Sequence, residues 1–359
     1  MGNLTRRSFM GSLAGGAVAL PFGAALAAPE AGAQAKVDAF VKSSGFNGIV
    51  HFVRGSQTVF SGAFGMADVE AGRRASLGTP YPLASISKWF SSVAVLRLVD
   101  QGKLRLDAAV SDYLKDFRAD TGAKVQLKHL LSNASGIPNG FGAMLKADPG
   151  LWTKPFTTAE AIKAFCSGDL AFEPGSRFSY DFTNWIIVQG IVETVTGEDF
   201  AQAVARLALA PLGVATVLPR YAPEVGGRIA AGYATIDPPV RKMFPQSIYT
   251  LASGGYCGTA ADLVRAAQGV YGARLLSAGS RAALATVLVP EQSYALGGRV
   301  KELGIGGTPH AFAWETGRVD GYRSLLAHRL DGGATLVVLN NTDLGQKDID
   351  LFAEALLTA

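Results

Sequence analysis

The strongest constraint in this sequence is that strand-like segments lie near both ends of the chain, with a long helical stretch between them. Two runs near the N-terminus are rich in β-branched and aromatic residues and predict a hairpin: Gly48 to Arg54 and Thr58 to Gly65. Three more runs follow near the C-terminus: Phe312 to Glu315, Tyr322 to Leu330 and Thr335 to Asn340. A tight turn at residues 331–333 joins the last two, so we expect them to pair antiparallel.

The simplest fold pairs the hairpin with the C-terminal strands in one antiparallel sheet, which the first and last helices cover. Between about residues 105 and 240 the pattern changes to short helices separated by Gly/Pro turns. We therefore expect the α+β class: an antiparallel sheet flanked by helices, with an inserted all-helical lobe. Residues 28–359 would form one domain, with an α/β lobe at about 36–104 and 241–359 and a helical lobe at about 105–240.

The first 27 residues have the pattern of a signal peptide. Arg6 and Arg7 form a twin arginine, residues 11–26 are apolar and rich in Gly and Ala, and Ala25-Leu26-Ala27 is a small-x-small cleavage site. A membrane anchor is the alternative, but the apolar stretch is short and contains Pro21. We expect cleavage after Ala27 and a periplasmic or secreted protein, exported folded by the twin-arginine route.

Charge and composition exclude several classes of protein. The formal net charge is only +4, and Arg6 and Arg7 would leave with the signal peptide, which argues against a nucleic-acid surface. The four histidines show no zinc-ligand spacing, so we expect no metal and no cofactor. Cys166 and Cys257 are far apart in a chain expected to fold in a reducing compartment, which favours two separate thiols.

The chemistry is expected at the beginning of a buried helix. Apolar residues recur at three- and four-residue steps from Ser85 to Gln101, and Gly102 then ends the pattern. Ser85 and Lys88 are three residues apart, so they lie on one face of this helix and the amine can reach the hydroxyl. A serine hydroxyl is a poor nucleophile until a base takes its proton, and a neutral lysine in an apolar setting can do so.

The motif alone is weak, because about one Ser-x-x-Lys is expected by chance in a chain of this composition. Without further support Ser85 would be a simple helix cap, and Lys88 a solvated residue of the first turn. The sequence around the pair therefore decides, and it contains no Gly-x-Ser-x-Gly motif that would favour a different hydrolase fold.

Several blocks occur in the order typical of one superfamily. They begin with Pro82-Leu83-Ala84-Ser85-Ile86-Ser87-Lys88, followed by 110–114, 129–138, Phe172 to Tyr180, 211–213, 231–233, 253–255 and Trp314-Glu315-Thr316-Gly317. Over about Gly48 to Asn340 the chain resembles the serine β-lactamase and penicillin-binding-protein superfamily. It is most similar to the class C-like branch, which includes esterases and D-amino-acid peptidases.

The resemblance implies a Ser-Lys-Tyr mechanism in a β-lactamase/transpeptidase-like fold. Ser85 would attack a carbonyl, and Lys88 and Tyr180 would pass its proton to the leaving group. The oxyanion hole would be the backbone N–H groups of Ser85 and Arg318. The substrate-binding positions would be these: Phe182, Asn184, Trp314, Glu315, Thr316 and Gly317.

Two of these positions depart from the family pattern. Phe182 stands where an asparagine usually binds a substrate amide, and Asn184 could replace it only if the loop were rearranged. Loss of that contact weakens amide recognition by about 1–3 kcal/mol. Glu315 stands where a cation usually meets a substrate carboxylate, so it would repel that group and attract an amine or a sugar-like hydroxyl. Glu315 could equally be structural and pair with Arg318 or another arginine.

We therefore expect an exported serine hydrolase that forms an acyl-enzyme on Ser85. The first hypothesis is a carboxylesterase for small or medium esters with little β-lactamase activity. The second is a D-aminopeptidase, an amidase or a D-Ala carboxypeptidase-like peptidase. The third is a catalytically idle protein that binds envelope glycans or peptides, although an idle site has no need of Ser85, Lys88 and Tyr180 together.

Overall fold

The computed structural model describes residues 30–245 and 247–359 and has the α+β fold; the expected signal peptide at residues 1–27 lies outside this range. Its main sheet has six antiparallel strands in the order β10-β11-β12-β13-β1-β2. The strand bounds are β1 Gly48–Arg54, β2 Gln57–Phe64, β10 Arg299–Ile305, β11 Thr308–Val319, β12 Tyr322–Arg329 and β13 Ala334–Asn340.

The two ends of the chain meet in the middle of this sheet, as the sequence predicted. β1 pairs antiparallel with β13 in a register that runs from Gly48 opposite Asn340 to Arg54 opposite Ala334. The approach is close, because a Cβ on Gly48 would lie 1.9 Å from the carbonyl oxygen of Leu339. The hairpin predicted at the N-terminus is β1 and β2.

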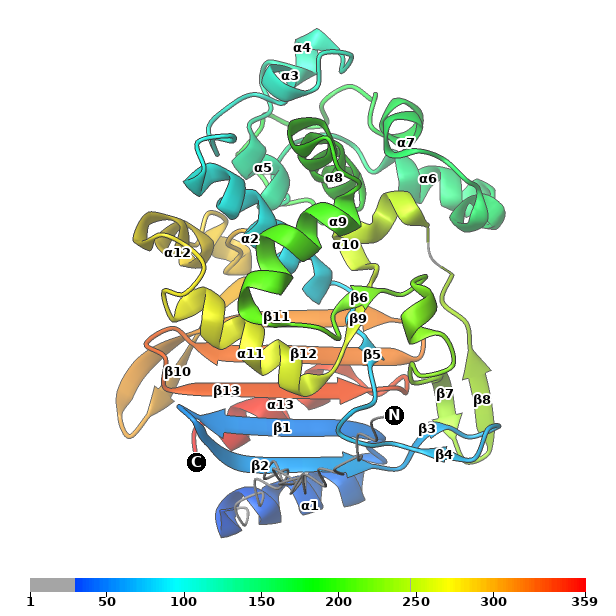
Figure 1. The fold of residues 1–359 in the computed structure, drawn as a ribbon, viewed down its shortest axis with the longest axis vertical. Helices are drawn as coiled ribbons and strands as arrows, with labels where there is room; N and C mark the ends of the chain where they lie inside the picture. Colours follow the sequence, from blue (N-terminus) through cyan, green and yellow to red (C-terminus); the bar gives the residue numbers. More distant parts are fainter. Residues whose placement is uncertain (1–29, 246) are drawn as a thin grey trace, which may run out of the picture.

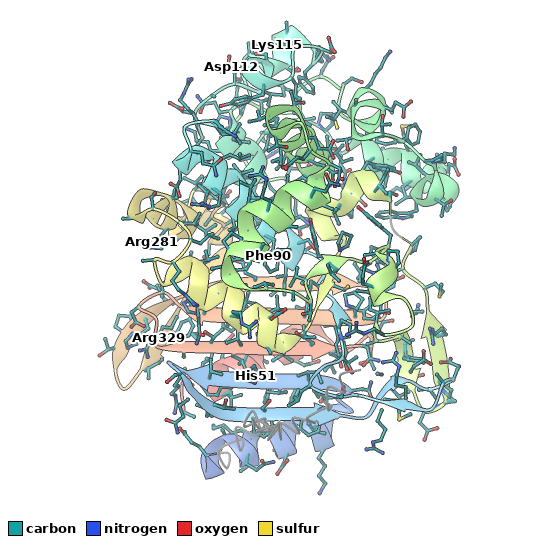
Figure 2. The ribbon with its side chains drawn as sticks, viewed as in Figure 1. His51, Phe90, Asp112, Lys115, Arg281 and Arg329 are labelled. Carbon is teal, nitrogen blue, oxygen red and sulfur yellow. The ribbon has the colours of Figure 1, made fainter. Side chains whose placement is uncertain are left out.

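Helices cover both faces of the sheet (Figure 1). One face carries α1 (Ala31–Ser44) and α13 (Gln346–Leu357), and the other carries α2 (Ile86–Asp100) and α11 (Ala260–Tyr271). Side chains fill the space between these layers: Figure 2 labels His51 on β1 and Phe90 on α2. The three-layer arrangement buries both faces of the sheet, so strands such as β13 are buried along their whole length.

The segment between α2 and α11 forms a largely helical lobe above the sheet (Figure 1). Its helices are α3 Val110–Tyr113, α4 Ala119–Gly122, α5 Leu127–Leu131, α6 Gly140–Ala147, α7 Thr158–Phe165, α8 Thr183–Thr196, α9 Phe200–Val204 and α10 Leu251–Gly254. α12 (Ala278–Ala285) follows α11 and packs on α2. Short strands of the described chain form three smaller sheets, β3-β4, β5-β9-β6 and β7-β8: β3 Met66–Asp68, β4 Arg73–Arg74, β5 Tyr81–Pro82, β6 Leu218–Pro219, β7 Gly232–Ile236, β8 Pro239–Lys242 and β9 Tyr256–Gly258.

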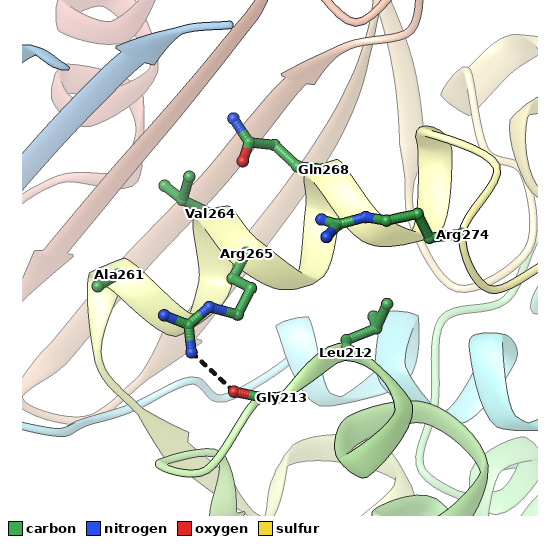
Figure 3. A pocket seen from close by; sticks show the side chains of 7 residues that line it. All are labelled: Leu212, Gly213, Ala261, Val264, Arg265, Gln268 and Arg274. Carbon is green, nitrogen blue, oxygen red and sulfur yellow. Dashed lines mark hydrogen bonds between the residues drawn. The ribbon is translucent and has the colours of Figure 1, made fainter. Parts of the chain in front are cut away.

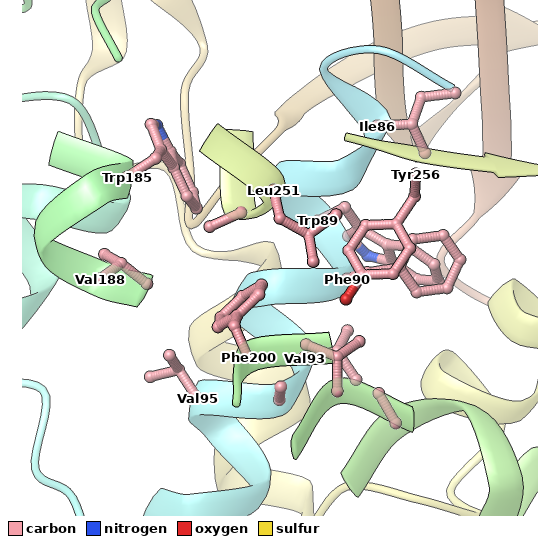
Figure 4. Close-up of a cluster of buried hydrophobic side chains, with 14 of the residues drawn as sticks. Ile86, Trp89, Phe90, Val93, Val95, Trp185, Val188, Phe200, Leu251 and Tyr256 are labelled. Atoms are coloured by element: carbon pink, nitrogen blue, oxygen red, sulfur yellow. The ribbon is translucent and has the colours of Figure 1, made fainter. Parts of the chain in front are cut away.

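Helix α2 joins the sheet to the helical lobe, and it is apolar around most of its circumference. Trp89 and Phe90 are at most 1% exposed. Figure 4 shows the cluster that they form with α8, α9, α10 and β9, which includes Trp185, Phe200 and Tyr256. A helix that is buried on all sides is fixed in place by its neighbours, so the residues at its beginning are held rigidly.

β10 (Arg299–Ile305) was not predicted, because its alternation of charged, apolar and glycine residues lacks a strand-like run. Cys166 and Cys257 are two separate buried thiols, as expected. Strands β6 and β7 lie within residues 105–240, so this part is not all-helical; its proposed boundaries stay a prediction.

Candidate active site

Ser85 lies at the beginning of α2 and directly follows a backbone turn that strands β9 and β12 hold in place. The N–H of Leu83 donates to the carbonyl of Tyr256 in β9 (2.9 Å), and the carbonyl of Leu83 accepts from Ser324 Oγ in β12 (2.9 Å). Ala84 has φ = 48°, a left-handed conformation that L-residues rarely adopt. Strain of this kind persists only where the surroundings impose it, and the anchored Leu83 supplies that constraint.

Lys88 is 2% exposed and points back along α2 to Ser85. Its Nζ donates to Ser85 Oγ at 3.1 Å and to the carbonyl of Ser253 at 2.6 Å. The aromatic rings of Tyr180, Phe182 and Trp185 surround it, with ring centroids 4.8–5.9 Å from Nζ: Tyr180 4.8 Å, Phe182 5.9 Å and Trp185 5.7 Å. No carboxylate of the described chain forms an ion pair with Lys88, so an apolar aromatic shell surrounds the amine.

Tyr180 comes from the helical lobe and completes the group. Its hydroxyl lies 2.7 Å from Ser85 Oγ, and its side chain is 45% exposed, so it faces the open side of the site. The preceding residue is anchored by the hydrogen bond from the N–H of Ser179 to the carbonyl of Asn133 (2.8 Å). The structure therefore brings together the three residues that the sequence predicted as catalytic, with both proton-carrying groups within hydrogen-bond reach of Ser85.

Asp181 is a further ionisable residue near the site, and no sequence motif singled it out. Its carboxyl group is 4% exposed; Oδ1 accepts from the N–H of Asn184 (3.2 Å), and no partner is present for Oδ2 among the described residues. Burial raises the pKa of Asp181 to about 6, and the charge of Lys88 opposes this shift. The sequence did contain a signal for this residue, because an aspartate just before an apolar helix is a common N-terminal cap.

Asn184, a predicted substrate-binding position, is buried and is not among the residues that line the pocket beside Ser85. Its side chain is 1% exposed; it accepts a hydrogen bond from Ser135 Oγ and donates to Asn133 Oδ1 at 3.3 Å. It therefore ties α8 to the segment after α5. Phe182 is half-buried, and its ring packs edge-on against Phe141 and Trp152, so its place near the nucleophile is apolar.

Strand β11 forms another wall of the site. Successive side chains along a strand point to opposite faces, so the predicted substrate-binding residues on β11 are divided between two faces. The side chain of Trp314 points to the far face, where its Nε1 donates to Asp350 of α13 (3.4 Å), although the residue also lines the pocket beside Ser85; its predicted role in substrate binding stays a prediction. Because side chains alternate along a strand, positions 315 and 317 face α2, and Thr316 faces the same side as Trp314. A Cβ on Gly317 would lie 2.1 Å from the carbonyl of Leu83, so only glycine allows β11 to approach the nucleophile turn this closely.

Arg318 is exposed and follows Gly317 on β11, opposite Arg323 of β12.

A narrow pocket opens between β11, β10 and Tyr180. It is lined by Ser85, Tyr180, Tyr294, Gly297, Gly298, Arg299, Trp314, Glu315 and Thr316. A second, shallow hollow between α11 and residues 212–213 contains Arg265 and Arg274 (Figure 3); Arg265 already donates to the carbonyl of Gly213 (2.7 Å), and Ser85 is not among the residues that line the hollow.

Glu315 is 4% exposed and has no hydrogen bond or ion pair in the part of the chain that the structure describes. Burial raises its pKa to about 8, although the charge of Arg299 opposes the shift. The pairing with Arg318 considered above is absent.

Within residues 30–245 and 247–359 no cluster of His, Cys, Asp and Glu is suited to hold a metal ion. No helix of the same residues is long and apolar enough to cross a bilayer.

A serine at the start of a buried helix, with a lysine one turn on and a tyrosine from a helical lobe, places the chain in the serine hydrolase superfamily. The Beta-lactamase family model matches residues 33–359, so the chain belongs to the beta-lactamase family.

The chain is also similar to individual proteins of known sequence or structure. The chain is 36% identical over 172 residues to esterase EstB of Burkholderia gladioli, an alignment that covers 45% of this chain and 44% of that esterase. The chain thus matches less than half the length of this curated relative. A penicillin-binding protein from Bacillus halodurans has a similar fold (TM-score 0.76, 23% identity, 89% of this chain and 99% of that one). So does EstCE1, described as a hydrolase with promiscuous acyltransferase activity (TM-score 0.74, 21% identity, 90% and 97%).

The buried carboxyl of Glu315 predicts a specific dependence of stability on pH. Its pKa is about 8 in the folded protein and near 4.5 when unfolded, so the unfolded chain loses this proton first as the pH rises. Wild type should therefore lose stability relative to Glu315→Gln between about pH 4.5 and 8, by up to about 1.4 kcal/mol per pH unit. Below and above this window the difference should be constant.

Urea unfolding of both proteins from pH 4 to 9 measures this difference. Glu302→Gln is a suitable control, because Glu302 is exposed on the neighbouring strand β10. The difference in the free energy of unfolding between Glu302→Gln and wild type should not change with pH. If the Glu315→Gln curve instead runs parallel to wild type, Glu315 is not held as a neutral acid in the folded protein.

Proposed function

We propose that this protein is a carboxylesterase that forms an acyl-enzyme on Ser85 and acts on small or medium esters. The observation that carries the proposal is that Ser85 Oγ contacts both Lys88 Nζ (3.1 Å) and the hydroxyl of Tyr180 (2.7 Å). One of these groups can accept the serine proton while the other holds the oxygen in position. A structural serine has no need of two such partners.

In the proposed reaction, Ser85 Oγ attacks the ester carbonyl as its proton passes to the Lys88–Tyr180 pair. The C–O bond to Ser85 forms, and the carbonyl oxygen becomes an oxyanion bound by the N–H groups of Ser85 and Arg318. The intermediate collapses, the alkoxide leaves, and the pair returns the proton to it. Water then attacks the acyl-enzyme by the same route and releases the acid.

An ester is favoured over an amide by the surroundings of the nucleophile. Phe182 presents an aromatic ring beside Lys88, where an amide-binding side chain would have to lie. An alkoxide is also a better leaving group than an amide nitrogen, so a site with little amide recognition still supports ester cleavage. The similarity to esterase EstB of Burkholderia gladioli supports the same choice. Glu315 stands where the resemblance places a cation that meets the carboxylate of a β-lactam, and a carboxyl group supplies no positive charge there, so cephalosporin hydrolysis should be slight.

Substitution of Ser85 tests the proposed reaction. Wild type should hydrolyse short-chain 4-nitrophenyl esters, and Ser85→Ala should reduce kcat by at least about a thousandfold, because the covalent step is lost. Tyr180→Phe should reduce kcat more than it changes KM, since its hydroxyl acts on the proton rather than on binding. D-amino-acid amides and a chromogenic cephalosporin belong in the same assay.

Ser43→Ala is the control, since Ser43 is exposed on α1, and its activity should match wild type. Turnover of D-amino-acid amides far above esters would replace the esterase with an amidase. Ester turnover that survives in Ser85→Ala would contradict the mechanism, and equal ligand binding without turnover in both proteins would favour an idle binding protein.

We further propose that the protein is exported through the twin-arginine pathway and works in the periplasm or outside the cell. The support is the sequence of residues 1–27 alone. The full chain expressed in a bacterium with this pathway should appear in the periplasm with a new N-terminus at Ala28. Arg6→Lys together with Arg7→Lys should retain it in the cytoplasm; export of this variant at the wild-type level would contradict the proposed route.

A further inference from the structure

The carboxyl group of Glu315 is buried beside the nucleophile without a partner of its own. A buried acid that lacks a hydrogen bond destabilises the fold. The neighbouring backbone leaves room for this carboxyl group, because a Cβ on Gly298 would lie 1.8 Å from Glu315 Oε2. Glycine at position 298 therefore makes the space that this carboxyl group occupies. The pocket that Glu315 lines also contains Ser85 and Tyr180.

Arg299 lines the same pocket and is also unpaired. Its guanidinium lies over the ring of Tyr294, 5.3 Å from the centroid, and it forms no ion pair or hydrogen bond with the described residues. Its charge acts on Glu315, yet the two groups do not form a direct salt bridge. The pocket therefore presents a donor-only group and a carboxyl group that face the same space without contacting each other.

We propose that Arg299 and Glu315 together bind an uncharged hydroxyl group of the substrate, which makes Glu315 the specificity-determining residue of the site. A hydroxyl can accept a hydrogen bond from Arg299 and donate one to Glu315 at the same time. This inference rests on the proposed function, and it narrows the substrate class to esters that carry a hydroxyl group, such as esters of polyols or of hydroxy acids.

The balance of charge favours a hydroxyl over the two ionic alternatives. A substrate ammonium would pair with Glu315, but it would be repelled by Arg299. A substrate carboxylate would pair with Arg299, but it would be repelled by Glu315 once that group is ionised. With Glu315 held as a neutral acid, a hydroxyl can bridge Arg299 and the Glu315 carboxyl group, so both gain a hydrogen-bond partner without a further charge entering the pocket.

Four phenyl acetates that differ only at the para position test this inference. The substituents are methyl, hydroxymethyl, aminomethyl and carboxylate, and phenyl benzoates with the same substituents on the benzoyl ring test the opposite orientation. In one of the two series, wild type should show a kcat/KM for hydroxymethyl at least about tenfold above methyl, the effect of one charge-assisted hydrogen bond. Aminomethyl and carboxylate should both fall below hydroxymethyl.

Glu315→Met and Arg299→Met should each bring the hydroxymethyl-to-methyl ratio close to one, and the double variant should lower it no further. Ratios within one variant cancel any change in overall activity. Glu315→Met should also unfold at a higher temperature than wild type at pH 8, because it removes a buried unpaired acid. Glu302→Met on β10 is the control, and its ratio should equal that of wild type.

Each outcome separates this inference from the proposed function. If wild type cleaves none of the esters, the esterase proposal fails. If it cleaves them with equal efficiency for methyl and hydroxymethyl, or if the ratio survives in Glu315→Met, the hydroxyl inference alone is wrong. A preference for aminomethyl would assign Glu315 to an amine, and a preference for carboxylate would assign Arg299 to an acid; either result would overturn the bridging role.

Discussion

The active site depends on the fixation of Leu83 by two strands. Its N–H is bonded to Tyr256 in β9, and its carbonyl is bonded to Ser324 in β12. With Leu83 fixed, Ala84 takes its left-handed conformation and Ser85 begins the buried helix α2. β12 is in turn held by β13, which pairs with the N-terminal strand β1. The position of the nucleophile therefore depends on segments from both ends of the chain.

Buried ionisable groups are concentrated around this point, and they favour function at the expense of stability. Lys88, Asp181 and Glu315 are each at most 4% exposed, and among the described residues none of them forms an ion pair. Each would cost stability in an ordinary core. The surrounding aromatic and aliphatic core compensates for this cost, because α2 buries apolar surface on nearly every side. A rigid apolar core thus holds a polar site that could not be stable by itself.

The sequence predicted the parts of the molecule that local pattern determines. The hairpin, the buried helix and the C-terminal strands follow from periodicity, and Ser85, Lys88 and Tyr180 follow from ordered motifs. It did not predict which way single side chains face. Trp314 and Asn184 point away from the site, since strand register and the burial of α8 depend on distant contacts. Asp181 was missed because its burial, rather than its type, makes it unusual.

The proposed mechanism requires Ser85 to be the covalent nucleophile. The most direct measurement is to react the purified protein with an active-site alkyl phosphonate and locate the label by peptide mass mapping. We expect one added phosphonyl group, on the peptide that contains Ser85, and no label when Lys88 is replaced by methionine. A label on any other residue, or equal labelling of wild type and Lys88→Met, would contradict the mechanism.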